Sequence, residues 1–202
     1  MREPFVANLK HRIGKGNRPR LALMTDDTRL PDPAATIRAL PPGSMVILRD
    51  YGAPGRAALA RRLAVLCKRR RLTFLVAGDW RLAARVGADG LHLPEAMAKR
   101  GRGPWSRRRW IVTAAAHSQA ALFRAARAGA DAALLAPVFP TASHPGRPAL
   151  GPVRFAAQVR RSPLPVYALG GIGPVTARRL KGAGHAGFAG IGEIARLGVR
   201  IA

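Results

Sequence analysis

The sequence is poor in cysteine, in acidic residues and in long apolar stretches, and each shortage excludes a class of protein. One cysteine, Cys67, stands among 202 residues, which leaves no internal disulfide framework and no cysteine-rich metal site. No apolar run approaches the roughly 18 residues that a membrane span needs, so we expect no membrane association. Residues 1–19 lack the apolar centre of a signal peptide, which favours a cytoplasmic protein.

Negative charge is scarce. The 10 acidic residues stand against 35 lysines and arginines, and arginine supplies nearly all of the resulting net charge of +25. One interpretation is a compositional bias toward arginine, spread evenly over the surface. The other is a basic surface that binds polyanions or nucleic acid weakly and without specificity, because neutralising phosphates needs only such a surface.

Apolar runs of strand length recur along the chain, in keeping with a hydrophobic content of 48%. Continuous runs of this kind are typical of strands buried on both faces. They occur over residues 21–26, 45–48, 72–77, 91–94, 110–113, 133–139, 165–174 and 186–193. Stretches with helical periodicity, such as 56–70 and 118–129, lie between them.

This alternation predicts an α/β fold, a single (β/α)8 TIM barrel over residues 20–202. A basic N-terminal extension over residues 1–19 precedes the barrel, and the last helix is stunted because few residues follow the last strand. A doubly wound open sheet is the alternative.

The last two predicted strands each break into glycines. Such glycines allow backbone N–H groups to approach an anion closely, because no Cβ intervenes. The loops after strands 7 and 8 form the usual phosphate site of a (β/α)8 barrel. We therefore predict phosphate binding by Gly170, Gly171, Gly190 and Gly192. The alternative is two tight turns with no ligand.

Polar side chains follow most of the other predicted strands, at the end where a barrel carries its active site. They are Asp26, Asp27, Arg49, Asp50, Tyr51, Asp79, His92, Glu95, His117, Thr141 and His144. Each one alone is ordinary loop chemistry, and for His92 we expect a structural role. Together they offer acids, imidazoles and a fixed cation near the glycine turns.

Six motifs in order resemble one superfamily. They lie at residues 23–26 (Leu-Met-Thr-Asp), 88–93 (Ala-Asp-Gly-Leu-His-Leu), 116–118 (Ala-His-Ser), 129–131 (Gly-Ala-Asp), 137–141 (Pro-Val-Phe-Pro-Thr) and 169–172 (Leu-Gly-Gly-Ile). The chain thereby resembles thiamine phosphate synthase and its sister branch, the TenI thiazole tautomerases, across residues 20–194.

Several positions depart from the synthase pattern. Tyr51 replaces a lysine, Met97 replaces the second metal carboxylate, and Ala115 replaces a serine. His144 replaces another lysine, whereas an acid is kept at Asp79. The synthase must neutralise a departing pyrophosphate with a metal and cations, and a thioether cannot replace a hard oxygen ligand of Mg²⁺. We therefore expect no cofactor, and Mg²⁺ only if synthase activity persists.

The remaining residues resemble the tautomerase branch more closely, which implies a proton shift on a thiazole carboxylate phosphate. His117 matches that branch's catalytic histidine, and an imidazole is the usual proton carrier near neutral pH. Its alternative role is that of a helix-cap neighbour kept for packing. The other candidates are Asp79 and Glu95 for catalysis, and Arg49, Thr141 and His144 for substrate binding.

Three functions therefore remain open. They are a tautomerase-like enzyme, a thiamine phosphate synthase, and a catalytically degenerate paralogue that binds a phosphorylated small molecule or a polyanion. Aromatic residues make up only 5% of the chain, which leaves few rings for stacking on bases. The sequence leaves oligomerisation open.

The basic clusters fall directly before predicted strands, which is the barrel face opposite the active site. They are Arg18 and Arg20, residues 68–71 and 107–109, Arg160 and Arg161, and Arg178, Arg179 and Lys181. The helix dipole accounts for one or two cations at each helix C-terminus. The excess predicts a basic N-terminal barrel face, whereas an even coat of arginine predicts no asymmetry.

Overall fold

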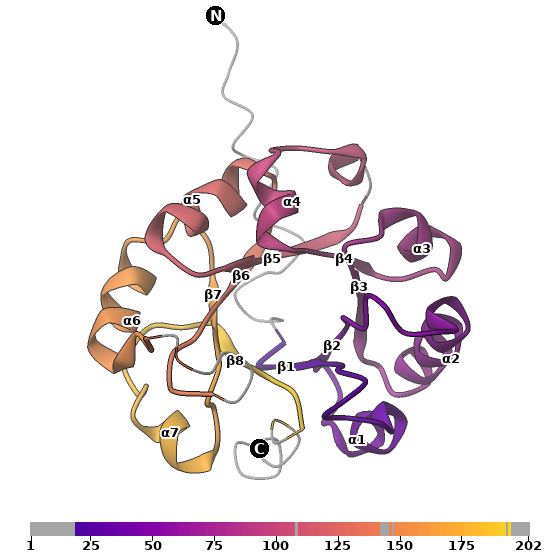
Figure 1. Cartoon of the computed structure of the whole chain (residues 1–202), viewed down its shortest axis with the longest axis horizontal. Coiled ribbons are helices and arrows are strands. Elements are labelled where there is room, and N and C mark those ends of the chain that lie inside the picture. Colours follow the sequence, from indigo (N-terminus) through magenta and orange to yellow (C-terminus); the bar gives the residue numbers. More distant parts are fainter. Residues whose placement is uncertain (1–18, 108, 142–145, 147, 193, 195–202) are drawn as a thin grey trace, which may run out of the picture.

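The computed structural model describes residues 19–107, 109–141, 146, 148–192 and 194. Eight parallel strands pair in sequence order and β8 pairs with β1, so that the sheet closes into a barrel with the helices around it (Figure 1). The predicted (β/α)8 barrel is confirmed, and the open sheet is wrong.

The strands are β1 (Leu21–Met24), β2 (Met45–Leu48), β3 (Thr73–Ala77), β4 (Gly90–Leu93), β5 (Ile111–Ala116), β6 (Ala132–Leu135), β7 (Val166–Leu169) and β8 (Gly187–Gly190). The helices are α1 (Pro33–Ala39), α2 (Arg56–Arg69), α3 (Trp80–Arg85), α4 (Glu95–Lys99), α5 (Gln119–Arg127), α6 (Gly151–Arg160) and α7 (Pro174–Arg178), and a 3-10 helix covers Pro104–Arg107.

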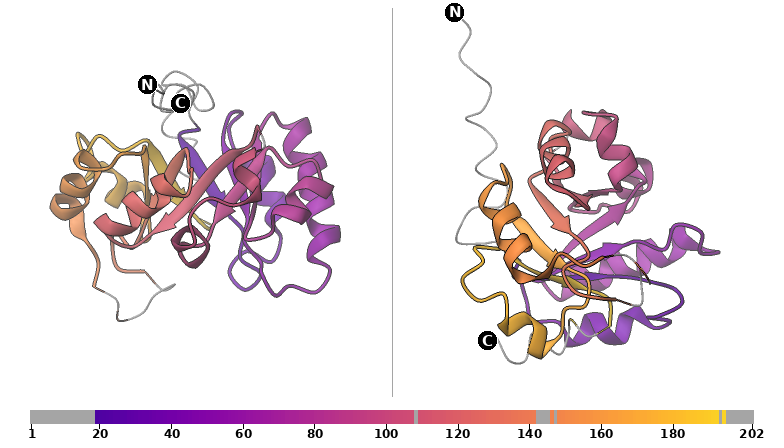
Figure 2. Two further views of the ribbon diagram at one scale, coloured as in Figure 1. Left: turned by 90° about the horizontal axis from the view of Figure 1, so that it is seen from above. Right: turned by 60° about the vertical axis from the view of Figure 1, so that its left-hand side comes forward.

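Alternation along the strands divides the core into two layers. Side chains of one parity, such as Met45, Leu75 and Tyr167, fill the barrel interior. Those of the other parity, such as Val46 and Phe74, pack against the helices, which Figure 2 shows lying outside the strands. Both faces of each strand are therefore buried, which is why the strands read as continuous apolar runs.

Two aspartates determine where strands begin on the N-terminal face of the barrel. Asp89 Oδ2 accepts a hydrogen bond from Phe74 N at 2.8 Å, and Asp131 Oδ2 accepts one from Val112 N at 2.8 Å. Each carboxylate thus ties the start of its own strand to the strand before it. The repeated Gly-Ala-Asp motif therefore has a structural role in this fold.

Short polar side chains start several helices on the opposite face, at the carboxyl ends of the strands. Asp32 Oδ1 accepts from Ala34 N, and Ser118 Oγ accepts from Ala121 N at 3.2 Å. Ser118 is thus the N-cap of α5. These caps satisfy N–H groups that have no partner inside the helix.

Two expectations about the ends of the chain concern residues outside the described part. The basic extension falls on residues 1–18, apart from Pro19, and the stunted last helix falls on residues after 194. Within the described residues, no helix is both long and apolar enough to span a membrane.

Candidate functional site

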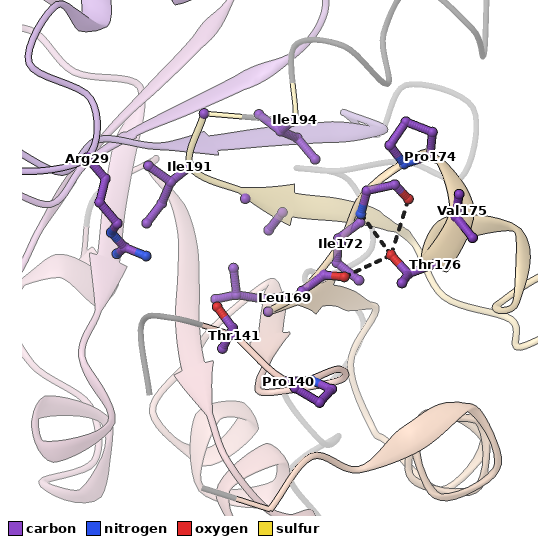
Figure 3. A pocket seen from close by; sticks show the side chains of 16 residues that line it. Arg29, Pro140, Thr141, Leu169, Ile172, Pro174, Val175, Thr176, Ile191 and Ile194 are labelled. Carbon is purple, nitrogen blue, oxygen red and sulfur yellow. Dashed lines mark hydrogen bonds between the residues drawn. The ribbon is translucent and has the colours of Figure 1, made fainter. Parts of the chain in front are cut away.

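A cavity of about 820 Å³ opens over the carboxyl ends of β7 and β8, where two glycine turns face each other (Figure 3). Its wall contains the turn after β7, the turn after β8, Arg29 from the loop after β1, and Pro140 and Thr141 from the loop after β6. The side chains labelled in Figure 3 are Arg29, Pro140, Thr141, Leu169, Ile172, Pro174, Val175, Thr176, Ile191 and Ile194. The structure thus brings together the four glycines that the sequence analysis assigns to phosphate, Gly170, Gly171, Gly190 and Gly192, and Thr141, which it assigns to substrate binding.

Three of the predicted glycines, Gly170, Gly171 and Gly192, differ in how far the protein itself requires glycine at that position. Gly170 and Gly171 have φ angles of 94° and 63°, which L side chains rarely adopt. A Cβ on Gly171 would also lie 2.5 Å from the Pro140 carbonyl oxygen. A Cβ on Gly192, by contrast, would enter open space, and its φ is not in the left-handed region. The protein itself therefore does not require glycine at 192, whereas a ligand close to the backbone would.

The hydroxyl group of Thr176 stabilises the turn after β7 through hydrogen bonds to its backbone. Thr176 Oγ1 donates to the Gly171 carbonyl at 2.8 Å and accepts from Gly173 N at 2.8 Å. Gly173 N–H is therefore occupied locally. Among the described residues, no backbone carbonyl accepts a hydrogen bond from the N–H group of Ile172 or Gly192. A rigid turn with such donors is suited to an anion.

Arg29 supplies a cation that the sequence analysis did not identify. Its guanidinium lines the cavity and donates to Asp26 Oδ2 at 2.6 Å, while its backbone N–H donates to Asp26 Oδ1 at 3.0 Å. Arg49 Nη2 bonds the same Asp26 oxygen. The Arg29 hydrogen bond is the main reason that the pKa of Asp26 falls to about 2. An ionised Asp26 therefore fixes Arg29 beside the glycine turns and holds Arg49 next to it.

His117 and Glu95 form a hydrogen-bonded pair between the ends of β5 and β4. His117 Nδ1 lies 2.6 Å from Glu95 Oε2, and Arg124 Nη2 donates to Glu95 Oε1 at 3.0 Å. Burial would raise the pKa of Glu95, but the hydrogen bonds from His117 and Arg124 lower it below its usual value. Glu95 is therefore an ionised carboxylate that orients the imidazole, and Nε2 is the ring nitrogen that would exchange a proton with a substrate.

Asp79 lies apart from this pair. Its carboxylate begins α3 by accepting from Leu82 N at 2.9 Å. It lines a second groove, of about 700 Å³, together with Tyr51, Trp80 and Met97. The structure therefore gives Asp79 a helix-capping role and brings it neither to the glycine cavity wall nor to Glu95.

His92 and His144 are two further candidate residues from the sequence analysis. His92 is 1% exposed inside the barrel and forms a 2.9 Å hydrogen bond with Thr113 Oγ1. It therefore occupies the core, as expected of a structural residue. His144 lies outside the described residues.

The donors at this end of the barrel do not fit Mg²⁺, which the family resemblance associates with synthase chemistry. Magnesium requires several hard oxygen ligands in octahedral geometry. Both Glu95 oxygens are bonded to cationic or imidazole groups, and Met97 presents a thioether that packs against the core. Among the described residues, no three His, Cys, Asp or Glu side chains gather as a metal site.

Comparisons with known proteins identify a family and relatives that the chain resembles. A family described as thiamine monophosphate synthase, TMP-TENI, matches residues 22–194. A thiamine-phosphate synthase of Thermus thermophilus is 35% identical over 145 residues, which are 68% of this chain and 68% of that protein. The thiamine-phosphate synthase of Chlorobium luteolum is 32% identical over 187 residues, covering 88% of this chain and 86% of that protein.

A solved structure agrees with the fold. Thiamine phosphate pyrophosphorylase from Pyrococcus furiosus superposes with a TM-score of 0.72 at 24% identity, covering 89% of this chain and 92% of that one. At this identity the likeness concerns the fold alone. The family match spans the strands, the glycine turns and the His117–Glu95 pair.

Proposed function

The chain belongs to the thiamine monophosphate synthase (TMP-TENI) family of thiamine biosynthesis, and from this premise we propose that it binds a thiazole phosphate and transfers a proton on it. In this proposal the phosphate group lies over the two glycine turns, beside Arg29. A proton leaves one position of the thiazole carboxylate phosphate and returns at another, so the phosphate ester stays intact. The activity is that of the TenI tautomerase branch.

The main support for this proposal is the cavity that Gly171 and Gly192 line. Its 820 Å³ suits a small phosphorylated ring compound, because ligand sites commonly measure about 300–1,000 Å³. Arg29 and the turn N–H groups supply positive potential for the phosphate. His117, oriented by Glu95, supplies an acid–base group, and this chemistry requires no pyrophosphate site.

Thiamine phosphate synthase is the second candidate, favoured by the names of the relatives. That reaction has to stabilise a departing pyrophosphate, which calls for a metal and cations. Here Tyr51 and Met97 occupy positions where the synthase pattern has a lysine and a carboxylate. These two replacements are the reason that we propose the tautomerase.

Two parallel assays of the purified chain distinguish these functions. We expect conversion of thiazole carboxylate phosphate to its tautomer at a rate that a metal chelator leaves unchanged. We expect no thiamine phosphate above background from pyrimidine-methyl pyrophosphate, thiazole phosphate and Mg²⁺. Metal-dependent formation of thiamine phosphate would establish the synthase instead. Phosphate binding with neither activity would identify a non-catalytic paralogue.

Replacing Gly192 by alanine tests the phosphate site separately from catalysis. The new Cβ enters open space in the protein, so the free energy of unfolding should stay within about 0.5 kcal/mol of the original. The affinity for inorganic phosphate or thiazole phosphate should fall about tenfold, or about 1.4 kcal/mol, because the methyl group occupies ligand space. Isothermal titration calorimetry measures both ligands.

Gly52→Ala is the matched control for this change. Gly52 has an ordinary φ, a Cβ added to it would meet no atom within 4 Å, and it has no part in the cavity wall. Its substitution should leave the phosphate affinity unchanged. If the original chain, Gly192→Ala and Gly52→Ala all bound phosphate with the same affinity, the anion could not bind at the glycine turns.

A further inference from the structure

Basic side chains gather on the N-terminal face of the barrel, opposite the glycine cavity. All the strands are parallel, so the chain returns to this face after each helix, before the next strand begins. The last turns and C-caps of α2 and α6 carry clusters of cations. The described members are Arg20, Arg38, Lys68, Arg69, Arg70, Arg71, Arg109, Arg127, Arg160, Arg161, Arg178 and Lys181.

Acidic groups do not balance this charge. Of the described acidic residues only Asp89 and Asp131 lie on the same face, where the cations outnumber them, and each carboxylate accepts a backbone N–H hydrogen bond from a neighbouring strand. The other described acidic residues lie at the opposite end, in strand-to-helix connections or at helix starts. Asp26 and Glu95, at that opposite end, form ion pairs with Arg29, Arg49 and Arg124.

A groove extends the basic face along the outer wall between α1 and α2, which lie side by side in Figure 1. It measures about 480 Å³ and has no acidic residue in its lining. Four arginines line it, Arg38, Arg61, Arg62 and Arg69, and all four are exposed. Arg38 and Arg69 belong to the last turns of their helices, where the helix dipole favours a cation. Arg61 and Arg62 lie in the middle of α2, so that explanation does not apply to them.

The surroundings of the groove indicate its partner. The large apolar side chains exposed among the described residues are Tyr51, Val65, Phe123, Val153 and Val175. Of these, only Val65 borders the groove. A lipid surface requires a broader apolar face, and single-stranded nucleic acid is usually held by aromatic stacking. A duplex phosphate backbone needs only the clustered guanidinium groups, which can bind phosphates bidentately.

We propose that the α1–α2 groove and the adjoining basic face bind the phosphate backbone of duplex nucleic acid without sequence specificity. The site is separate from the glycine cavity, so a bound duplex and a bound small phosphate do not compete. The interaction is steeply dependent on salt, because each phosphate contact releases condensed counterions.

Fluorescence anisotropy of a labelled DNA duplex, titrated with the full chain at several salt concentrations, tests this inference. The variant R62Q/R69Q removes two charges from the groove. The variant R81Q/R154Q removes two exposed charges from the first turns of α3 and α6, at the opposite end. Net charge is the same in both, so only the position of the lost charge differs.

We expect R62Q/R69Q to weaken DNA binding at least tenfold and to reduce the slope of log K against log salt by about 2, which corresponds to two lost phosphate contacts. R81Q/R154Q should change the affinity less than threefold. Millimolar inorganic phosphate should not displace the duplex beyond its effect as a salt. Equal losses in the two variants, or displacement by phosphate at constant ionic strength, would overturn the proposal. So would binding to anionic lipid vesicles with none to DNA.

Discussion

Replacing His117 by alanine is expected to reduce the turnover of thiazole carboxylate phosphate by about 100-fold or more, the usual contribution of a positioned acid–base group. The structure sets this imidazole 2.6 Å from the Glu95 carboxylate, which fixes its orientation. Phosphate affinity should be retained, because His117 is not part of the glycine cavity wall. Steady-state kinetics and calorimetry on the same preparation measure the two effects.

Glu95→Gln separates positioning from proton transfer in this prediction. The amide can still hydrogen-bond the imidazole but lacks the negative charge of the carboxylate. We expect a smaller loss of kcat than in His117→Ala, with KM for the substrate unchanged. Unimpaired turnover in His117→Ala would assign the proton transfer to another residue and leave the pair with a structural role at the junction of α4 and α5.

The fold could be predicted because its determinants are local and repeated. A buried parallel strand requires apolar residues at every position, and the chain supplies such runs from β1 to β8. The glycine turns were also predictable, because positive φ at Gly170 and Gly171 leaves a direct mark on the sequence. Both features follow from short-range backbone constraints.

The contacts within the site could not be predicted in the same way. His117 and Glu95 meet because β4 and β5 are neighbours, and the exact pairing depends on side-chain rotamers that spacing does not determine. Arg29 follows Asp26 by three residues in the loop after β1, and this spacing was a signal that an ion pair could form there. Nothing in the local sequence indicated that the loop would reach the turns after β7 and β8.

The neutral His92 in the barrel interior is expected to make the protein sensitive to mild acid. Burial, and then the charge of Arg49, lower the pKa of His92 from 6.5 to about 4. As the pH falls below 6.5, the unfolded chain gains a proton at this residue and the folded protein does not. The contribution of His92 to the free energy of unfolding therefore falls by about 1.4 kcal/mol per pH unit through this window, and this contribution levels off below pH 4.

His92→Gln should remove most of this slope, since glutamine can hydrogen-bond Thr113 and does not titrate. Urea unfolding at pH 7 and pH 5 should show the original chain losing about 2 kcal/mol more than the variant between the two values. The acids whose folded pKa is lowered, Asp26 and Glu95, affect stability only below this range. Burial also lowers the pKa of His185, so His185→Gln is the matched control and should remove a smaller part of the slope, because His185 is only half-buried. An identical slope in His92→Gln and in the original chain would mean that the barrel interior accepts the imidazolium, and that water solvates it or Arg49 moves away from it.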